Sequence, residues 1–254
     1  MKPEPPSPLR WSTFAAPKRF FALAGALVPW CWAVAALASL AGLYMGFFVA
    51  PTDFQQGESY RIIFIHVPAA WMSMLLYLAI AFWSALGWGL NARMASTLAR
   101  AIAPTGAVFT AAALVTGALW GQPTWGTWWV WDARLTSELI LLLLYLGYIA
   151  LVEAIDDPRR SAQAGALLSL VGALNVPIIY FSVRWWNTLH QGASVSLTAA
   201  PKMAQTMLQA MGLMTLAFWA LAFAVILTRA RGLVLELEAE ADWVARQYRH
   251  DEGR

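Results

Sequence analysis

The sequence has little charge and almost no cysteine. Only 12% of its 254 residues are charged and 60% are hydrophobic, whereas soluble domains carry about 25% charged residues. The single cysteine, Cys31, excludes an internal disulfide, a thiol redox pair and a paired-cysteine motif for covalent attachment of a prosthetic group. A Walker-type glycine-rich loop is also missing, so the chain does not hydrolyse nucleotides by that route.

The sequence contains several long hydrophobic runs. An α-helix of about 20 apolar residues spans a bilayer, and six stretches of suitable length predict an all-α integral membrane protein with six transmembrane helices. The predicted spans are 22–49, 62–90, 105–120, 136–152, 165–183 and 205–228. This divides the chain into an N-terminal tail (1–21), a six-helix membrane domain (22–228) and a C-terminal tail (229–254).

The basic residues predict the orientation. With both ends on one side of the membrane, that side holds thirteen Lys and Arg residues and the other side holds four, namely Arg61, Arg134, Arg184 and Lys202. Basic residues concentrate on the cytoplasmic side. We therefore expect both termini in the cytoplasm, and the 51–61 loop, the Trp-rich link and the 184–204 loop on the outside.

The segment 120–138 contains five of the chain's 15 tryptophans. Gly121, Pro123 and Gly126 argue against a long helix here, so we expect a loop or a short interfacial helix between the third and fourth spans. Trp gathers at membrane interfaces, which makes an aromatic belt one interpretation. A binding platform of flat aromatic faces is the other, and the residues alone leave both open.

Two of the three histidines fall on the same predicted side as the Trp-rich link. His66 lies at the outer end of the second span and His190 lies in the last outer loop. A histidine at the end of a span is commonly an interfacial, hydrogen-bonded residue. Two imidazoles flanking an aromatic surface, however, suit a haem site, because neutral imidazole is a good iron ligand. Glu138 is the one carboxylate placed inside a span, which disfavours a proton-relay transporter.

Three motifs in order resemble the cytochrome c maturation protein C (haem exporter protein C) family. The first motif runs from His66 to Ser73 and the second from Trp125 to Glu138, with Asp132 closing its Trp-rich signature. The third motif comprises residues 185–192 and ends in His190-Gln191-Gly192. The resemblance extends over nearly the whole chain.

The resemblance implies that the protein holds haem b transiently at the periplasmic face of the bacterial inner membrane and presents it to a periplasmic haem chaperone, cytochrome c maturation protein E (CcmE). The ATP-binding cassette subunits CcmA and CcmB and the small subunit CcmD are the other implied partners. Such a protein handles and transfers haem and is not an enzyme. The implied site is formed by His66 and His190 as axial ligands, a haem and chaperone platform of Trp120, Trp125, Trp128, Trp129, Trp131 and Asp132, and propionate contacts from Arg134 and Arg184. Asp132 is expected to orient the loop, because an unpaired carboxylate would repel the propionates.

Two other classes remain as alternatives. A membrane electron-transfer cytochrome would keep its haem, usually between histidines in the middle of a bundle, and no histidine lies in the middle of a predicted span. A structural subunit with Trp residues as anchors would bind no haem. A haem spectrum and capture of haem by the chaperone separate the three classes.

Overall fold

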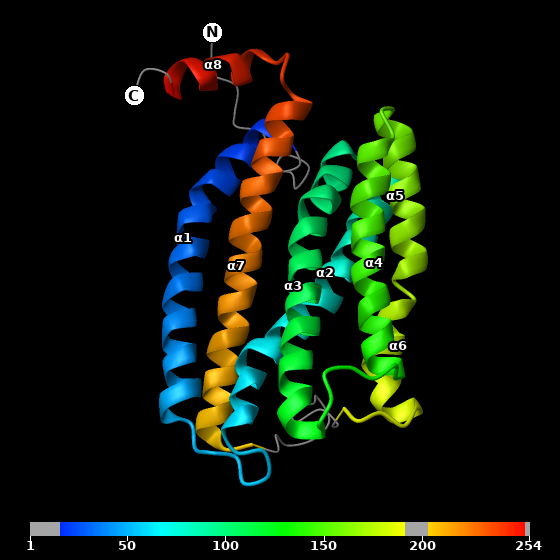
Figure 1. The fold of residues 1–254 in the computed structure, drawn as a ribbon. Coiled ribbons are helices and arrows are strands. Elements are labelled where there is room, and N and C mark those ends of the chain that lie inside the picture. Colours follow the sequence, from blue (N-terminus) through cyan, green and yellow to red (C-terminus); the bar gives the residue numbers. More distant parts are fainter. Residues whose placement is uncertain (1–15, 191–202, 252–254) are drawn as a thin grey trace.

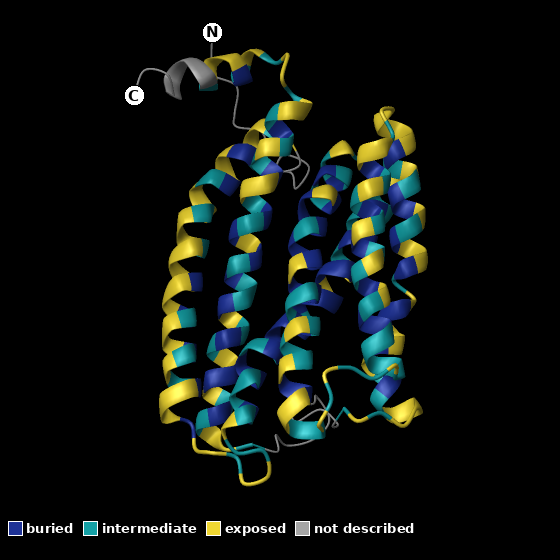
Figure 2. Cartoon of the chain, in the orientation of Figure 1, coloured by how far each residue is buried: buried dark blue, intermediate teal, exposed yellow. Residues whose placement is uncertain are grey.

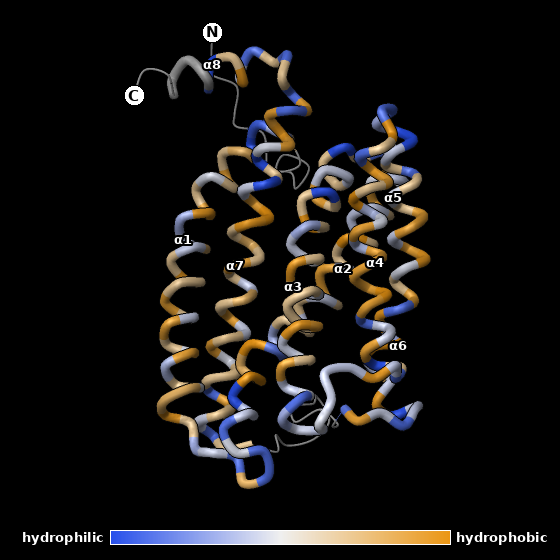
Figure 3. Tube along the Cα trace, viewed as in Figure 1, coloured by the Kyte–Doolittle hydropathy of each residue, from blue (hydrophilic) through white to orange (hydrophobic). Residues whose placement is uncertain are grey.

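Long apolar helices confirm the predicted all-α membrane fold. The structure, a computed structural model, describes residues 16–190 and 203–251. Within them, six helical segments are long and apolar enough to cross a bilayer: Pro17–Val49, Glu58–Gly89, Arg93–Trp125, Ala133–Ala154, Pro158–Trp185 and Gln205–Leu237. Many hydrophilic residues gather at the two ends of the bundle (Figure 3). The chain is therefore a multi-pass membrane protein.

The helices follow one another along the chain as ten segments in the described residues. Their bounds are α1 Pro17–Tyr44, the π-helical turn η2 Met45–Val49, the 3₁₀ helix η3 Glu58–Ile62, α2 Ile63–Gly89, α3 Arg93–Trp125, α4 Ala133–Ala154, α5 Pro158–Gly172, α6 Asn175–Trp185, α7 Gln205–Leu237 and α8 Asp242–Asp251. The 50–58 loop, the link between α3 and α4, the end of α6 and the start of α7 lie at one end of the bundle (Figure 1).

The tilted helix α2 connects the two sides of the bundle. α1 packs mainly on α7, and α4 packs on α3, α5 and α6, whereas α2 contacts α3, α5 and α7. Figure 1 shows α2 crossing behind α3, from the side of α7 to the side of α5. The start of α2 thereby lies at the same end of the bundle as the end of α3.

The outer face of α1 is apolar and exposed. Trp30, Leu37 and Leu40 are 73%, 68% and 69% exposed, and Figure 2 shows a largely exposed outer surface along this helix. Contiguous apolar surface of this kind is rare in soluble proteins and is covered by lipid in membrane proteins. On its inner face, α1 approaches α7 closely at Gly42, where a Cβ atom would lie 2.8 Å from the sulfur of Met214.

The third span is longer than predicted and takes in part of the Trp-rich segment. α3 extends to Trp125, where the sequence predicted a span of 105–120 followed by a loop. Pro123 lies in the last turn, so its missing N–H removes one helical hydrogen bond and does not end the helix. The helix ends at Gly126, which has a left-handed φ of 77° and donates its N–H to the carbonyl of Gln122. The link that remains is residues 126–132.

The fifth span is two helices instead of one. α5 ends at Gly172 and α6 begins at Asn175. Pro177 lies in the first turn of α6 and has no N–H to continue the hydrogen bonding from α5. Asn175 fixes the break by donating its amide Nδ2 to the carbonyl of Ser137 on α4 at 2.8 Å. The break turns α6 so that its C-terminal end lies near the start of α4.

Candidate functional site

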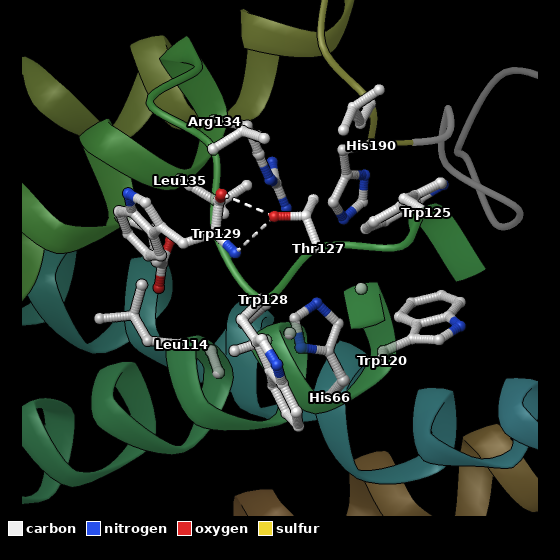
Figure 4. A pocket seen from close by; sticks show the side chains of 18 residues that line it. His66, Leu114, Trp120, Trp125, Thr127, Trp128, Trp129, Arg134, Leu135 and His190 are labelled. Atoms are coloured by element: carbon white, nitrogen blue, oxygen red, sulfur yellow. Dashed lines mark hydrogen bonds between the residues drawn. The ribbon is translucent and has the colours of Figure 1, made fainter. Parts of the chain in front are cut away.

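A small cavity lies where the ends of α2, α3 and α4 meet the link. Its volume is about 50 Å³. Its walls include both predicted histidines, Trp120, Trp125, Thr127, Trp128, Trp129, Arg134 and Glu138. Figure 4 shows the two imidazoles entering from different sides of the chain segment around Thr127, with Trp120 and Trp125 beside them.

The two imidazoles lie within reach of a shared ligand. His66 comes from the first turn of α2 and is buried, and His190 comes from the segment after α6. The centroids of their rings are 6.3 Å apart and the planes differ by 36°. A metal ion that binds each imidazole nitrogen at about 2 Å fits between rings at this separation.

A hydrogen bond from α3 determines which nitrogen of His66 is available. The Nδ1 atom of His66 is 3.0 Å from the hydroxyl of Thr116. That hydroxyl donates its one hydrogen to the carbonyl of Ala112 at 2.6 Å. The Nδ1 atom must therefore carry the hydrogen and donate to Thr116, which leaves a lone pair on Nε2. Metal-binding histidines are oriented by partners of this kind.

Two tryptophans border the gap between the imidazoles. The ring centroid of Trp120 is 5.6 Å from that of His66 and 6.5 Å from that of His190. Trp125 is 6.0 Å from His190 and 6.1 Å from Trp120. Both rings line the cavity from the last turns of α3. Together they provide flat apolar surfaces with N–H edges.

Small residues on α3 allow this close packing. A Cβ atom at Gly117 would lie 3.1 Å from Cε1 of His66. At Gly121 it would lie 3.0 Å from the carbonyl oxygen of Thr127, in the link. Any larger side chain at these positions would push α2 or the link away from the cavity.

A cation and a carboxylate line the inner part of the cavity. Arg134, in the first turn of α4, donates from Nη1 to the carbonyl of Ile179 on α6 at 2.8 Å. Glu138, one turn further, accepts a 2.7 Å hydrogen bond on Oε1 from the hydroxyl of Ser73. Its Oε2 atom is buried and has no hydrogen-bond partner among the described residues. A buried carboxylate in a membrane helix is costly and commonly serves a functional site.

The sequence matches one family over most of its length. The family described as "Heme exporter protein C" matches residues 10–245. The chain belongs to this family. It is 45% identical over 239 residues to a Heme exporter protein C of Escherichia coli, covering 92% of this chain and 96% of that protein. It is 48% identical over 223 residues to that of Bradyrhizobium diazoefficiens, covering 87% and 84%. A mitochondrial ccmC-like protein of Marchantia polymorpha is 48% identical over 176 residues, covering 69% and 73%.

In this member of the family, the structure brings most of the predicted site residues together. His66, His190, Trp120, Trp125, Trp128, Trp129 and Arg134 all line the cavity. Asp132 instead caps α4 by accepting the N–H of Leu135 on Oδ1 at 2.8 Å. No ion pair joins it to Arg134 in the described part of the chain.

Two predicted residues lie outside the cavity. Trp131 is 77% exposed, and its ring centroid is 5.4 Å from that of Trp129, which lines the cavity. Arg184 is exposed in the last turn of α6 and is not among the lining residues. Trp131 therefore belongs to the surface beside the cavity, and of the two predicted propionate contacts only Arg134 is positioned to reach a ligand inside it.

Sequence reasoning missed the residues that hold the site in place. Thr116 and Gly117 precede Trp120 by four and three positions, so helical periodicity places them on the same face of α3. Glu138 follows Arg134 by four positions in the same way. These patterns were available in the sequence. The hydrogen bond from Nε1 of Trp120 to Oε1 of Gln56, at 2.8 Å, joins residues 64 positions apart and has no such signal.

Proposed function

We propose that this protein binds haem at the periplasmic face of the inner membrane and delivers it to the periplasmic haem chaperone CcmE in the maturation of c-type cytochromes. The observation that carries the proposal is the pair of imidazoles, 6.3 Å apart, at one end of a membrane-spanning bundle. Membership of the Heme exporter protein C family supports the same function.

Each part of the site has a role in this proposal. His66 and His190 ligate the iron, His66 through Nε2. Arg134 binds a propionate, because a guanidinium pairs well with a carboxylate. Trp120, Trp125, Trp128 and Trp129 contact the macrocycle. The haem is b-type and held without a covalent bond, since the one cysteine, Cys31, lies on α1.

The position of the site favours delivery over retention. Trp128 and Trp131 are 58% and 77% exposed beside the cavity. Exposed aromatic residues of this kind are typical anchors of protein interfaces. We propose that this surface contacts the chaperone. CcmA, CcmB and CcmD are the other proposed partners of the protein. An electron-transfer cytochrome, the alternative, would instead retain its haem.

The histidines provide the first test. Haem that copurifies with the wild-type protein in detergent is measured by the pyridine haemochrome assay and by the Soret band. We expect His66→Ala and His190→Ala each to lower haem affinity more than about tenfold, because loss of even an outer partner of a metal ligand costs about 10- to 100-fold. His250→Ala, at the third histidine, is the matched control. Unchanged haem content and Soret position in both variants would exclude the histidines as ligands.

A transfer experiment separates delivery from retention. Haem-loaded protein is mixed with the purified soluble domain of the chaperone, and haem on each protein is followed after separation. Delivery predicts that haem leaves this protein and accumulates on the chaperone. Haem that stays with the membrane protein through many equivalents of chaperone would identify a haem-retaining cytochrome.

A further inference from the structure

The ring of Trp120 lies where a ligand of both histidines would extend. A macrocycle ligated by two imidazoles has its plane between them, about midway along the line that joins them. The Trp120 centroid is nearly equidistant from the two rings, at 5.6 and 6.5 Å. The indole therefore occupies the equatorial plane of the site. A cavity of about 50 Å³ between the walls is also too small for a tetrapyrrole, so one wall must move.

A second, larger cavity lies on the other side of Trp120. Its volume is about 310 Å³. Trp120 lines both cavities, and the other walls of the second cavity are Pro51, Thr52, Asp53, Phe54, Gln56, Tyr60, Ile63, Met203, Ala204 and Met207. The indole is thus a partition between a confined space and an adjoining one with room for a side chain.

A hydrogen bond holds this partition in its present position. Nε1 of Trp120 donates to Oε1 of Gln56 at 2.8 Å. Gln56 is itself fixed by the loop, since Oδ1 of Asp53 accepts the backbone N–H groups of both Gln55 and Gln56. Arg61, in η3 directly after the loop, ties it to the end of the first span, because its Nη1 donates to the carbonyls of Gly46 in η2 and of Ala50. The acceptor for the indole is therefore held on a rigid support.

We propose that Gln56 is a positioning residue that latches Trp120 across the haem site, and that haem enters as this bond breaks and the indole moves into the second cavity. The inference rests on the proposed function, because the ligand that displaces the indole is a planar tetrapyrrole held by His66 and His190. The indole then borders the apolar edge of the macrocycle. When the indole returns to its hydrogen bond with Gln56, it displaces that edge of the macrocycle and so favours the release of haem.

Removal of the latch tests the first part of the proposal. Association of haem with the apoprotein in detergent is followed by stopped-flow absorbance at the Soret band. Gln56→Leu should accelerate association by about two- to tenfold, the factor that corresponds to one neutral hydrogen bond. Gln55→Leu changes an exposed neighbour in the same loop and is the matched control. A purely structural role for Gln56 predicts a lower melting temperature without faster association, and that result would overturn the proposal.

A double-mutant cycle tests whether Gln56 acts through the indole. Trp120→Phe keeps an aromatic wall and removes the N–H donor. Gln56→Leu should then give no further acceleration in the Trp120→Phe background, because the bond is already absent. Equal acceleration in both backgrounds would show that Gln56 acts by another route and would contradict the latch.

Filling the second cavity tests the movement of the indole. Ala204 lines this cavity and lies outside the haem site, so Ala204→Phe should slow haem association while leaving the two histidines intact. Gln205→Phe, at the next position and outside both cavities, is the control. Association at the wild-type rate in a normally folded Ala204→Phe variant would overturn the proposal. Failure of the wild-type protein to bind haem would instead reject the proposed function.

Discussion

Arg134 and Arg184 illustrate how one residue type takes two roles at the same end of the bundle. Both were candidates for contact with haem propionates. Arg134 faces the cavity from the first turn of α4 and donates to the carbonyl of Ile179. Arg184 lies exposed in the last turn of α6, where a cation stabilises the C-terminal end of a helix. Each residue is surrounded by apolar and aromatic neighbours in the sequence, so the sequence alone could not separate them.

This difference leads to a prediction at the residue scale. Arg134→Gln should weaken haem binding by about 10- to 100-fold, the factor that corresponds to a hydrogen bond between charged groups. It should weaken binding of haem dimethyl ester much less, since the ester has no propionate charge. Arg184→Gln is the matched control. Equilibrium titration at the Soret band measures all six affinities, and an equal loss for haem and its ester would mean that Arg134 acts only by packing.

The individual contacts of the site could be predicted only in part. The position of Thr116 one turn before Trp120, on the same face of α3, follows from helical spacing, whereas its contact with His66 on α2 does not. The approach of His190 to His66 was expected only from topology. The contact between Gln56 and Trp120, and the second cavity behind it, depend on how the 50–58 loop folds against the start of α7. Nothing in local sequence determines such a contact.

At the scale of the elements, the ends of α3 and α4 set the shape of the Trp-rich link. Gly126 reverses the chain with a φ of 77°, and Asp132 starts the next helix as its N-cap. The link is therefore shorter than the sequence predicted, and Trp120 and Trp125 are displayed from a rigid helix. The prediction failed here because Gly and Pro in the last turn of a helix cost little, whereas in a soluble helix interior they are strong breakers.

The conformation of Gly126 can be tested by substitution. Gly126→Ala should destabilise the protein by about 1–2 kcal/mol, the cost of a left-handed backbone for a residue with a Cβ atom. Gly89→Ala is the matched control, because a Cβ atom at either glycine meets nothing within 4 Å and Gly89 has no positive φ. Melting temperatures in detergent compare the two. A drop of similar size in both variants would show that the backbone at Gly126 is not the cause.

At the scale of the whole molecule, the number of spans followed directly from composition. Uncharged runs predicted six membrane helices, and the described part of the chain contains six helical segments long and apolar enough to span a bilayer. The break in the fifth span at residues 173–174 was missed because Asn175 and Pro177 sit in a run that remains apolar on average. Which faces of these helices meet one another was also beyond the sequence, since apolar residues face both lipid and protein neighbours.

The predicted orientation can be tested by thiol labelling. In a Cys31→Ser background, Phe54→Cys places a thiol at a position that is 92% exposed in the 50–58 loop. We expect a membrane-impermeant reagent to label it from the periplasmic side, because the topology predicted from the sequence puts thirteen of the seventeen basic residues on the opposite side. Asp156→Cys, in the turn between α4 and α5 at the other end of the bundle, should react only after the membrane is opened. The reverse pattern would invert the orientation and contradict periplasmic delivery.

The packing of α1 against α7 has a consequence for biosynthesis. The first span of the chain finds its main partner in the last one, since α1 contacts chiefly α7. At a synthesis rate of about 5–20 residues per second, α1 stays in the membrane for on the order of ten seconds or more before α7 is made. During that time its inner face, with Gly42 near its C-terminal end, is open to lipid and to the spans of other proteins. The bundle closes only once the ribosome has completed nearly the whole chain.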